Sequence, residues 1–405
     1  MTTTIRPPRQ SPAAEPAPRG GLAARIRLGR VFAPVPPEFI FILSSALILT
    51  GFGIVMILSA TSATSVEAGG GPYDDAIKQA IYAAIGIPLM LIVSRVPTRF
   101  WKRIAWPLLI AALCGQLLVF VPGLGVTDYG NTNWIHIGGI QAQPSEFIKL
   151  ALAIWMGTIL ARKGPLLRRW KHVYIPVIPV AILAMGLVLK GGDLGTTMML
   201  VLVFLGALFF SGVRLRIFIL PLLGMAAAVA VAAVTNPNRM RRILSFLDTD
   251  TAACYRDMCY QSLHGIWGLS AGGVFGLGLG NSKQKYSWLP AAANDYIFAI
   301  VGEELGLIGC LVMIGLFVLM AVGMFHVIRR TQDPFARIVT GAVVTWIIGQ
   351  AAINIAVVLR VFPVLGVPLP FVSQGGTSLV SVLVACGVIL AFARDLPPRA
   401  RAVAR

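Results

Sequence analysis

Long apolar runs separated by short polar segments recur along the chain from residue 38 to residue 393. A helix needs about 20 mostly apolar residues to cross the hydrocarbon core of a bilayer. The pattern therefore predicts an all-α fold, a polytopic membrane protein with about ten transmembrane helices. The runs fall at residues 38–60, 77–96, 101–121, 143–161, 173–190, 195–211, 216–234, 296–327, 337–360 and 376–393.

The same pattern divides the chain into a membrane domain and two tails. Residues 1–37 are rich in proline and arginine and show no apolar periodicity, so we expect a disordered cytoplasmic tail. Residues 38–393 form the transmembrane domain, and residues 394–405 form a short cytoplasmic tail. The first apolar run is too long for the core of a signal peptide and predicts a spanning helix. The longest interval between runs, residues 235–294, predicts one large extracellular loop.

Basic residues outnumber acidic residues by 34 to 16, which gives the chain a net charge of +18. A strongly basic chain can be a nucleic-acid binder. Here, however, the basic residues gather in short blocks between apolar runs, as they do in the cytoplasmic loops of membrane proteins. With both termini inside, 24 of the 34 basic residues fall on the cytoplasmic side. We therefore expect a multi-pass protein of the cytoplasmic membrane, in contact with membrane lipids and with no nucleic-acid partner.

Acidic residues concentrate on the opposite side, in the outer loops and at the outer ends of the predicted helices. Because acidic residues contribute little to topology, insertion does not explain this bias. In LPAAANDYIFAIVGEELG (289–306), Asp295 precedes an apolar run, where it or Asn294 can cap the helix. Glu303 and Glu304 lie two turns deeper, and adjacent helix positions point about 100° apart. At least one of the two must therefore face the bundle interior or a wet boundary, which indicates a site with acidic groups.

The stretch GNTNWIHIGGIQAQPSEFIKL (130–150) leads into the fourth predicted helix. A helix start suits Ser145, and Glu146 in the first turn complements the positive end of the helix dipole. Lys149 shares a face with Glu146, so the two form either a structural ion pair or part of a functional site. In KGGDLGTT (190–197), Asp193 either caps the sixth helix or completes a polar cluster beside Lys149.

The irregular segment GVPLPFVSQGGTSLVS (366–381) precedes the last predicted helix. Ser373 and the amides of Gly375 and Gly376 can bind an anionic group at a helix N-terminus. A re-entrant turn with a hydroxyl cap is an equally good interpretation.

The long outer loop carries basic residues, among them Arg242 and Lys285, on either side of a glycine-rich middle. They suit an anionic lipid or a pyrophosphate, whereas solvated surface charge is the simpler alternative. We also expect a disulfide between Cys254 and Cys259, because both lie on the oxidising side of the membrane.

Together these stretches resemble the SEDS family (shape, elongation, division and sporulation), which includes FtsW and RodA. WIHIGGIQAQPSEFIKL is similar to the family's R-W-I…Q-P-S-E-F-A-K-L, and GGDLGTT to its P-D-L-G-T. LPFVSQGGTSL is similar to L-P-F-[IV]-S-Y-G-G-S-S-L. The resemblance covers almost the whole chain after the N-terminal tail, and GLGLGNSKQK looks more like the FtsW branch than like RodA.

The resemblance implies a peptidoglycan glycosyltransferase that polymerises lipid II at the outer face of the cytoplasmic membrane, at the division septum. It implies as partners a class B penicillin-binding protein, which supplies transpeptidation, and other divisome proteins. The family's implicated carboxylate matches Asp295, and its P-D-L-G aspartate matches Asp193. Its Q-P-S-E-F-x-K motif places Gln143 beside Ser145, Glu146 and Lys149 as substrate-binding candidates.

The mechanism that we expect uses Asp295 as general base for the acceptor sugar hydroxyl. The leaving pyrophosphate needs positive charge, from Lys149, from the basic residues of the loop, or from a divalent cation such as Mg²⁺ or Mn²⁺. We assign no metal ligands and no other cofactor. Two alternatives are a flippase for the lipid-linked precursor and a non-catalytic divisome scaffold. The inner halves of the predicted helices are nearly free of charge, which favours the enzyme over the flippase.

The chain departs from the family pattern in three places. Where the family commonly has L-P-E-A-H-T-D-F, residues 289–296 read LPAAANDY, so no Glu or His precedes Asp295 in this stretch. The family's Arg before Trp-Ile is Asn133 here, and the Tyr of S-Y-G-G is Gln374. These changes alter details of the expected substrate contacts.

Overall fold

The computed structural model describes residues 35–128, 131–137, 140–219, 221–224 and 259–397, with residues 227, 240 and 255. The compact unit that begins at Pro36 is built almost entirely of helices. Its elements, in chain order, are α1 (Pro37–Glu67), α2 (Asp74–Val93), α3 (Thr98–Leu118), β1 (Gly125–Asp128), β2 (Asn131–Ile137), β3 (Ile140–Ala142), α4 (Pro144–Arg162), the 3₁₀ helix η2 (Gly164–Arg168), α5 (Trp170–Lys190), α6 (Leu194–Phe210), the 3₁₀ helix η3 (Leu215–Phe218), α10 (Tyr260–Gly272), α11 (Ile297–Arg330), α12 (Pro334–Val358) and α13 (Gly376–Arg394).

The predicted membrane fold is confirmed. Within the described residues, seven helices are long and apolar enough to cross a membrane, namely α1, α2, α4, α5, α11, α12 and α13. Helix α6 and residues Leu215–Gly224 are shorter apolar helices. The seventh predicted run, 216–234, lies largely outside the described residues, as does much of the loop at 235–294. The count of ten helices and the extent of the loop therefore stay predictions.

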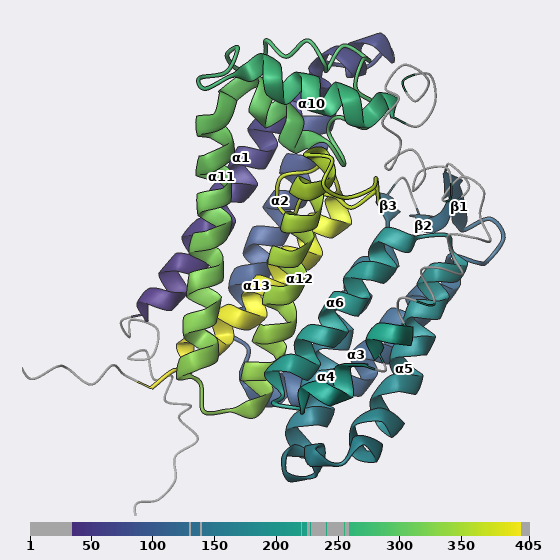
Figure 1. Ribbon diagram of the computed structural model, residues 1–405, viewed down its shortest axis with the longest axis vertical. Coiled ribbons are helices and arrows are strands. Elements are labelled where there is room, and N and C mark those ends of the chain that lie inside the picture. The colour runs from purple at the N-terminus through teal and green to yellow at the C-terminus, as the bar shows by residue number, and fades with distance from the viewer. Residues whose placement is uncertain are drawn as a thin grey trace, which may run out of the picture. The chain divides into compact units, whose positions relative to one another are not determined.

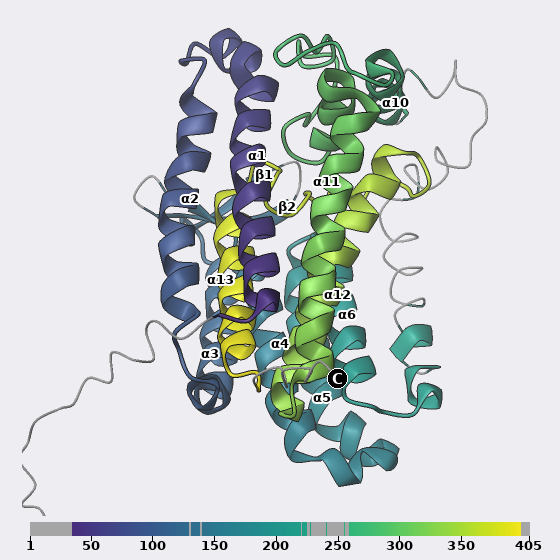
Figure 2. The ribbon, with the colours of Figure 1, turned by 90° about the vertical axis from the view of Figure 1, so that its left-hand side faces the viewer.

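The interior of the bundle is formed by α4 and α13. In α4 and in α13, 78% of the apolar 18-residue stretch that could span a membrane is buried. The corresponding fraction is 33% in α2 and 29% in α5. Helix α1 packs against α11, α2 against α13, and α12 against both α4 and α6. The start of α1 and the end of α13 lie at one end of the bundle, and α10 lies at the opposite end (Figures 1 and 2).

A small sheet between α3 and α4 was not predicted. Its strands are antiparallel in the order β1-β2-β3, with a register irregularity between Val126 and Thr127. Strand β3 leads directly into Gln143, the N-cap residue of α4. The Thr132 amide in β2 donates to the Gly191 carbonyl at 2.8 Å, in the turn before α6. The sheet therefore joins the starts of α4 and α6.

Helix α11, predicted as one continuous run, is broken at Gly306. This residue has φ 66° and ψ −164°, a conformation that glycine adopts far more readily than other residues. A Cβ on Gly302 would lie 3.2 Å from Cys310 Sγ. In a straight helix, residues eight positions apart are separated by about 12 Å. The chain therefore folds back sharply at Gly306, and residues 297–305 form a short separate helix.

Candidate active site

Asp295 lies in the turn before α11 and is half-buried. Helix α11 begins at Ile297 with Tyr296 as its N-cap residue, and the Tyr296 side chain makes no capping hydrogen bond. The alternative in which Asn294 or Asp295 serves as a helix cap stays a prediction. The Asp295 carbonyl accepts a hydrogen bond of 2.7 Å from Asn354 Nδ2 of α12. The same Nδ2 donates to the Val367 carbonyl, also at 2.7 Å, so one amide joins two irregular segments.

Residues 363–375, which we call the α13 lead-in, hold the Asp295 turn from the other side. The Ser373 hydroxyl donates to the Asn294 carbonyl, and the Gln374 amide donates to the Ala293 carbonyl at 2.9 Å. Gln79 of α2 donates to the Ser373 carbonyl and accepts from the Gly375 amide, both at 3.3 Å. The Ser373 hydroxyl and the Gly375 amide, predicted to bind an anion, are thus both engaged with protein groups.

The start of α6 reaches the same segment. A Cβ on Gly195 would lie 2.6 Å from the Leu365 carbonyl oxygen, so only a residue without a side chain permits this approach. A Cβ on Gly366 would lie 3.6 Å from Asp295 Oδ2, and Gly366 has a positive φ of 66°. The start of α6 therefore contacts the α13 lead-in, and the α13 lead-in lies next to the Asp295 carboxylate. The three motifs KGGDLGTT, GVPLPFVSQGGTSLVS and LPAAANDYIFAIVGEELG thus meet in the folded chain.

Asp193 connects the α6 start with the α4 start. Its carboxylate caps α6 by accepting from the Thr196 amide at 2.7 Å, and it also accepts from Gln143 Nε2 at 3.0 Å. Desolvation raises the pKa of the Asp193 carboxyl, hydrogen bonds from Thr196 oppose the shift, and the Glu146 charge adds to it. Both interpretations made from the sequence therefore hold at once, because Asp193 is a cap and a member of a polar cluster.

Glu146 and Lys149 form an ion pair inside the bundle. Lys149 Nζ lies 2.8 Å from Glu146 Oε1, and their side chains are only 1% and 3% exposed. Lys149 also donates to Gln350 Oε1 at 3.4 Å, and Ser381 donates to Glu146 at 3.4 Å. Gln350 in turn donates to the Pro368 carbonyl at 2.8 Å. The ion pair is therefore linked to the α13 lead-in through Gln350. The charges of Glu146 and Lys149 neutralise each other.

The remaining predicted residues have varied surroundings. Ser145 is fully buried, and its hydroxyl has no hydrogen-bond partner among the described residues. Gly376 is the first residue of α13. Lys285 is 4% exposed and its ammonium turns inward, toward the Gly280 carbonyl and the Glu304 carboxylate. Arg242 lies outside the described residues.

The described part of the chain contains no group of three or more His, Cys, Asp or Glu side chains arranged to hold a metal ion. Cys259 is buried and disulfide-bonded. Cys254 lies outside the described residues, so the predicted pairing of these two cysteines stays a prediction.

Three buried side-chain amides that donate hydrogen bonds to the α13 lead-in were not predicted from the sequence. Gln79, Gln350 and Asn354 are at most 2% exposed and lie within the predicted runs 77–96 and 337–360. A buried amide costs free energy unless it is hydrogen-bonded. Their presence inside apolar runs was therefore a signal that a polar segment packs against these helices.

Comparison with known proteins adds a family. A family model described as cell cycle protein, for FtsW, RodA and SpoVE, matches residues 39–396. A protein of Mycobacterium tuberculosis (strain H37Rv) named "Probable peptidoglycan glycosyltransferase FtsW" is 35% identical over 378 residues, which cover 93% of this chain and 72% of the relative. A protein of the same name from Marinobacter nauticus is 37% identical over 373 residues, covering 90% and 91%.

Two solved structures share the fold. A chain from a study titled "Structural coordination of polymerization and crosslinking by a peptidoglycan synthase complex" matches with a TM-score of 0.71 and 23% identity. The rod shape determining protein RodA of Thermus thermophilus matches with a TM-score of 0.66 and 22% identity. Each match covers 90% of this chain and 99% of the other.

Proposed function

Because the chain belongs to the family of FtsW, RodA and SpoVE cell cycle proteins, we propose that it is a peptidoglycan glycosyltransferase with Asp295 as its general base. The substrate in this proposal is lipid II, and the product is a glycan strand made at the outer face of the cytoplasmic membrane. The names of its relatives support the reaction type. The geometry around Asp295 supports the site.

The observation that carries the proposal is the placement of Asp295. Its backbone is held by Asn354, and the turn before it is held by Ser373 and Gln374. Hydrogen bonds from two elements, α12 and the α13 lead-in, thus fix the backbone that carries the Asp295 carboxylate. A general base must be held in a fixed position relative to the proton that it removes.

In the proposed reaction, the acceptor sugar hydroxyl attacks the anomeric carbon of the lipid-linked donor. The bond between that carbon and the pyrophosphate oxygen breaks, and the polyprenyl pyrophosphate leaves with the electron pair. Asp295 takes the hydroxyl proton. The leaving group carries negative charge that must be stabilised. Because Lys149 and Lys285 are each paired with a buried glutamate, the arginines of the long loop or a divalent cation are the better candidates for this role.

The proposal places the chain at the division septum, with a class B penicillin-binding protein and other divisome proteins as partners. The FtsW name of the relatives and the GLGLGNSKQK stretch support the division branch.

Glycan-strand formation from purified lipid II in proteoliposomes, with and without the partner, tests the proposal. We expect strands in the presence of the chain. Transfer of lipid II between leaflets without strands would indicate a flippase, and neither activity under both conditions would indicate a scaffold.

Both tails are expected on the cytoplasmic side and the loop at 235–294 outside. Single cysteines at Ser11 and Ser287, in a background without the native cysteines, should react with an impermeant reagent from opposite sides of the membrane. Ser287 suits this test because it is exposed. Reaction of both from the same side would contradict the predicted topology.

Asn354→Leu is expected to lower the kcat of polymerisation roughly 10²-fold, because small displacements of a catalytic group have effects of that size. The substitution keeps the side-chain volume approximately but removes both hydrogen bonds that Asn354 donates. The measurements are kcat and KM with lipid II, together with the temperature of thermal unfolding.

Gln116→Leu is the matched control for this variant. Gln116 is a buried amide on α3 with no hydrogen-bond partner among the described residues, so its replacement should leave kcat nearly unchanged. Equal losses of kcat in the two variants would show that Asn354 has no particular role in positioning Asp295.

A further inference from the structure

The segment between α10 and α11 exposes a stretch of apolar side chains and buries charged side chains behind it. We call residues 273–280 the apolar loop. In it, Phe275 is 82% exposed and Leu279 is 54% exposed. Directly behind it, Glu303 and Glu304 are 0% exposed and Lys285 is 4% exposed. In water the opposite arrangement is the stable one.

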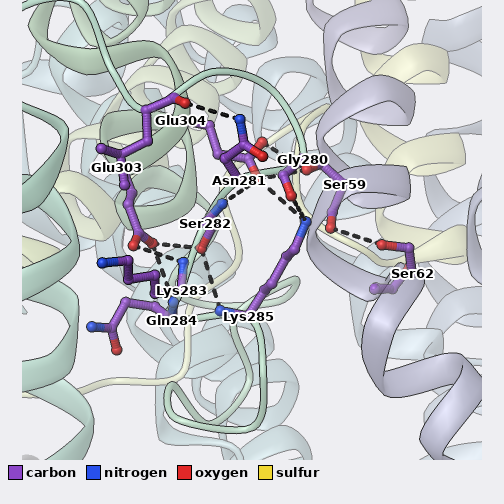
Figure 3. Close-up of polar contacts among 12 residues, drawn as sticks. Ser59, Ser62, Gly280, Asn281, Ser282, Lys283, Gln284, Lys285, Glu303 and Glu304 are labelled. Atoms are coloured by element: carbon purple, nitrogen blue, oxygen red, sulfur yellow. Dashed lines mark hydrogen bonds and ion pairs between the residues drawn. The ribbon is translucent and has the colours of Figure 1, made fainter.

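Two carboxylates hold the residues that follow the apolar loop (Figure 3). Glu303 accepts hydrogen bonds from the Ser282 hydroxyl and from the Lys283 amide at 2.9 Å. Glu304 accepts from the Ser59 hydroxyl of α1 at 2.6 Å and from the Ser282 amide at 3.2 Å. Figure 3 shows Lys285 extended alongside this group, and its ammonium lies 3.7 Å from Glu304. Glu303 and Glu304, which the sequence placed inside a helix, thus attach residues 282–285 to the helix bundle.

The backbone of the apolar loop fills the break in α11. The amides of Leu277 and Gly278 donate to the carbonyls of Glu303 and Glu304, each at 2.9 Å. In the other direction, the Leu307 amide donates to the Gly273 carbonyl at 2.9 Å. The Glu303 and Glu304 carbonyls and the Leu307 amide, all at the break, are therefore paired within the protein. Irregular backbone at membrane depth requires such pairing.

The apolar surface of the loop continues the apolar surface of α11. The hydrogen bond between Leu307 and Gly273 places the loop beside the helix residues just after the break. On that part of α11, Leu307, Leu311 and Val312 are each more than half exposed, as expected of side chains that face lipid. Val274 and Phe275, which follow Gly273 in the loop beside these helix residues, are 53% and 82% exposed.

Helix length gives the depth of the loop. From Leu307 to Arg330, α11 is about 36 Å long at about 1.5 Å per residue. The hydrocarbon core of a bilayer is about 30 Å thick. With Arg329 and Arg330 at the cytoplasmic boundary, an untilted helix places the break at Gly306 about 6 Å beyond the hydrocarbon core, in the headgroup region at the outer boundary.

We propose that the apolar loop inserts into the outer leaflet at this boundary and anchors the segment before Asp295 to the membrane. The occupant of this surface is membrane lipid, because the surface is continuous with the lipid-facing side of α11. The anchor fixes the height of the chain that leads to Asp295 above the bilayer. The proposal does not depend on the proposed enzymatic function.

Spin labels on single cysteines in the full chain test the insertion. Cys114, Cys310 and Cys386 are replaced by alanine, and Cys259 is left because it is disulfide-bonded. Labels are placed by Phe275→Cys and Leu279→Cys, with Leu311→Cys as the lipid-facing control and Lys283→Cys as the water-facing control. The protein is reconstituted in vesicles of phosphatidylethanolamine and phosphatidylglycerol, and the collision rates with oxygen and with a water-soluble nickel chelate are measured.

We expect the labels at positions 275 and 279 to resemble the label at position 311, with frequent oxygen collisions and nickel collisions at least severalfold rarer than at position 283. Nickel collisions as frequent as at position 283 would overturn the proposal, because the loop would then lie in water. Shielding from both reagents would overturn it as well, because a second copy of the chain would then cover the loop. The readout needs no activity, so its failure is distinct from failure of the proposed function.

Discussion

Replacing Lys149 with methionine is expected to lower the free energy of unfolding by about 3–5 kcal/mol, because it leaves the buried Glu146 charge without its partner. The ion pair has a distance of 2.8 Å and is almost completely buried, so solvent does not screen the loss. The variant is measured by denaturant or thermal unfolding in detergent, alongside the wild-type chain.

The double variant Glu146→Gln, Lys149→Met is the control. It removes both charges, so no uncompensated charge remains in the bundle, and most of the lost stability should return. A Lys149→Met variant of normal stability that has lost activity would contradict this account. In that case Lys149 would act on the substrate and not as a structural support.

The apolar runs predicted nine of the described helices well, because bilayer thickness sets the length of a spanning helix. The break at Gly306 was missed, since glycine is frequent in transmembrane helices and gives no local sign of a positive φ. What stabilises the break is the apolar loop, which meets Gly306 only in the folded chain. The sheet before α4 was missed because its strands are only 4, 7 and 3 residues long.

The sequence predicted residues of the site but not the hydrogen bonds and ion pairs that connect them. Helix geometry required that Glu303 or Glu304 face inward, and the structure turns both inward because α11 is broken two residues later. The Q-P-S-E-F-x-K motif singled out Lys149, and the basic charge of the long loop singled out Lys285, as cations for a substrate. The pairing of Lys285 with Glu304 could not be foreseen, because Glu304 is distant from Lys285 in the sequence.

Asp295→Asn is expected to slow polymerisation roughly 10²–10⁴-fold, the usual contribution of a general base. The amide keeps the shape of the side chain but cannot accept the proton. Because the amide can still accept hydrogen bonds, the free energy of unfolding should fall by at most about 1 kcal/mol. Loss of rate at normal stability therefore separates catalysis from structural support.

The most direct measurement is the initial rate of glycan-strand formation from lipid II by equal amounts of inserted wild-type chain, Asp295→Asn and Asp75→Asn. Asp75 is a surface carboxylate on α2 paired with Lys78, so its replacement controls for the change of one charge. The account predicts a near-normal rate for Asp75→Asn and a rate at least about 10²-fold lower for Asp295→Asn. A near wild-type rate for Asp295→Asn would contradict the assignment of Asp295 as the general base.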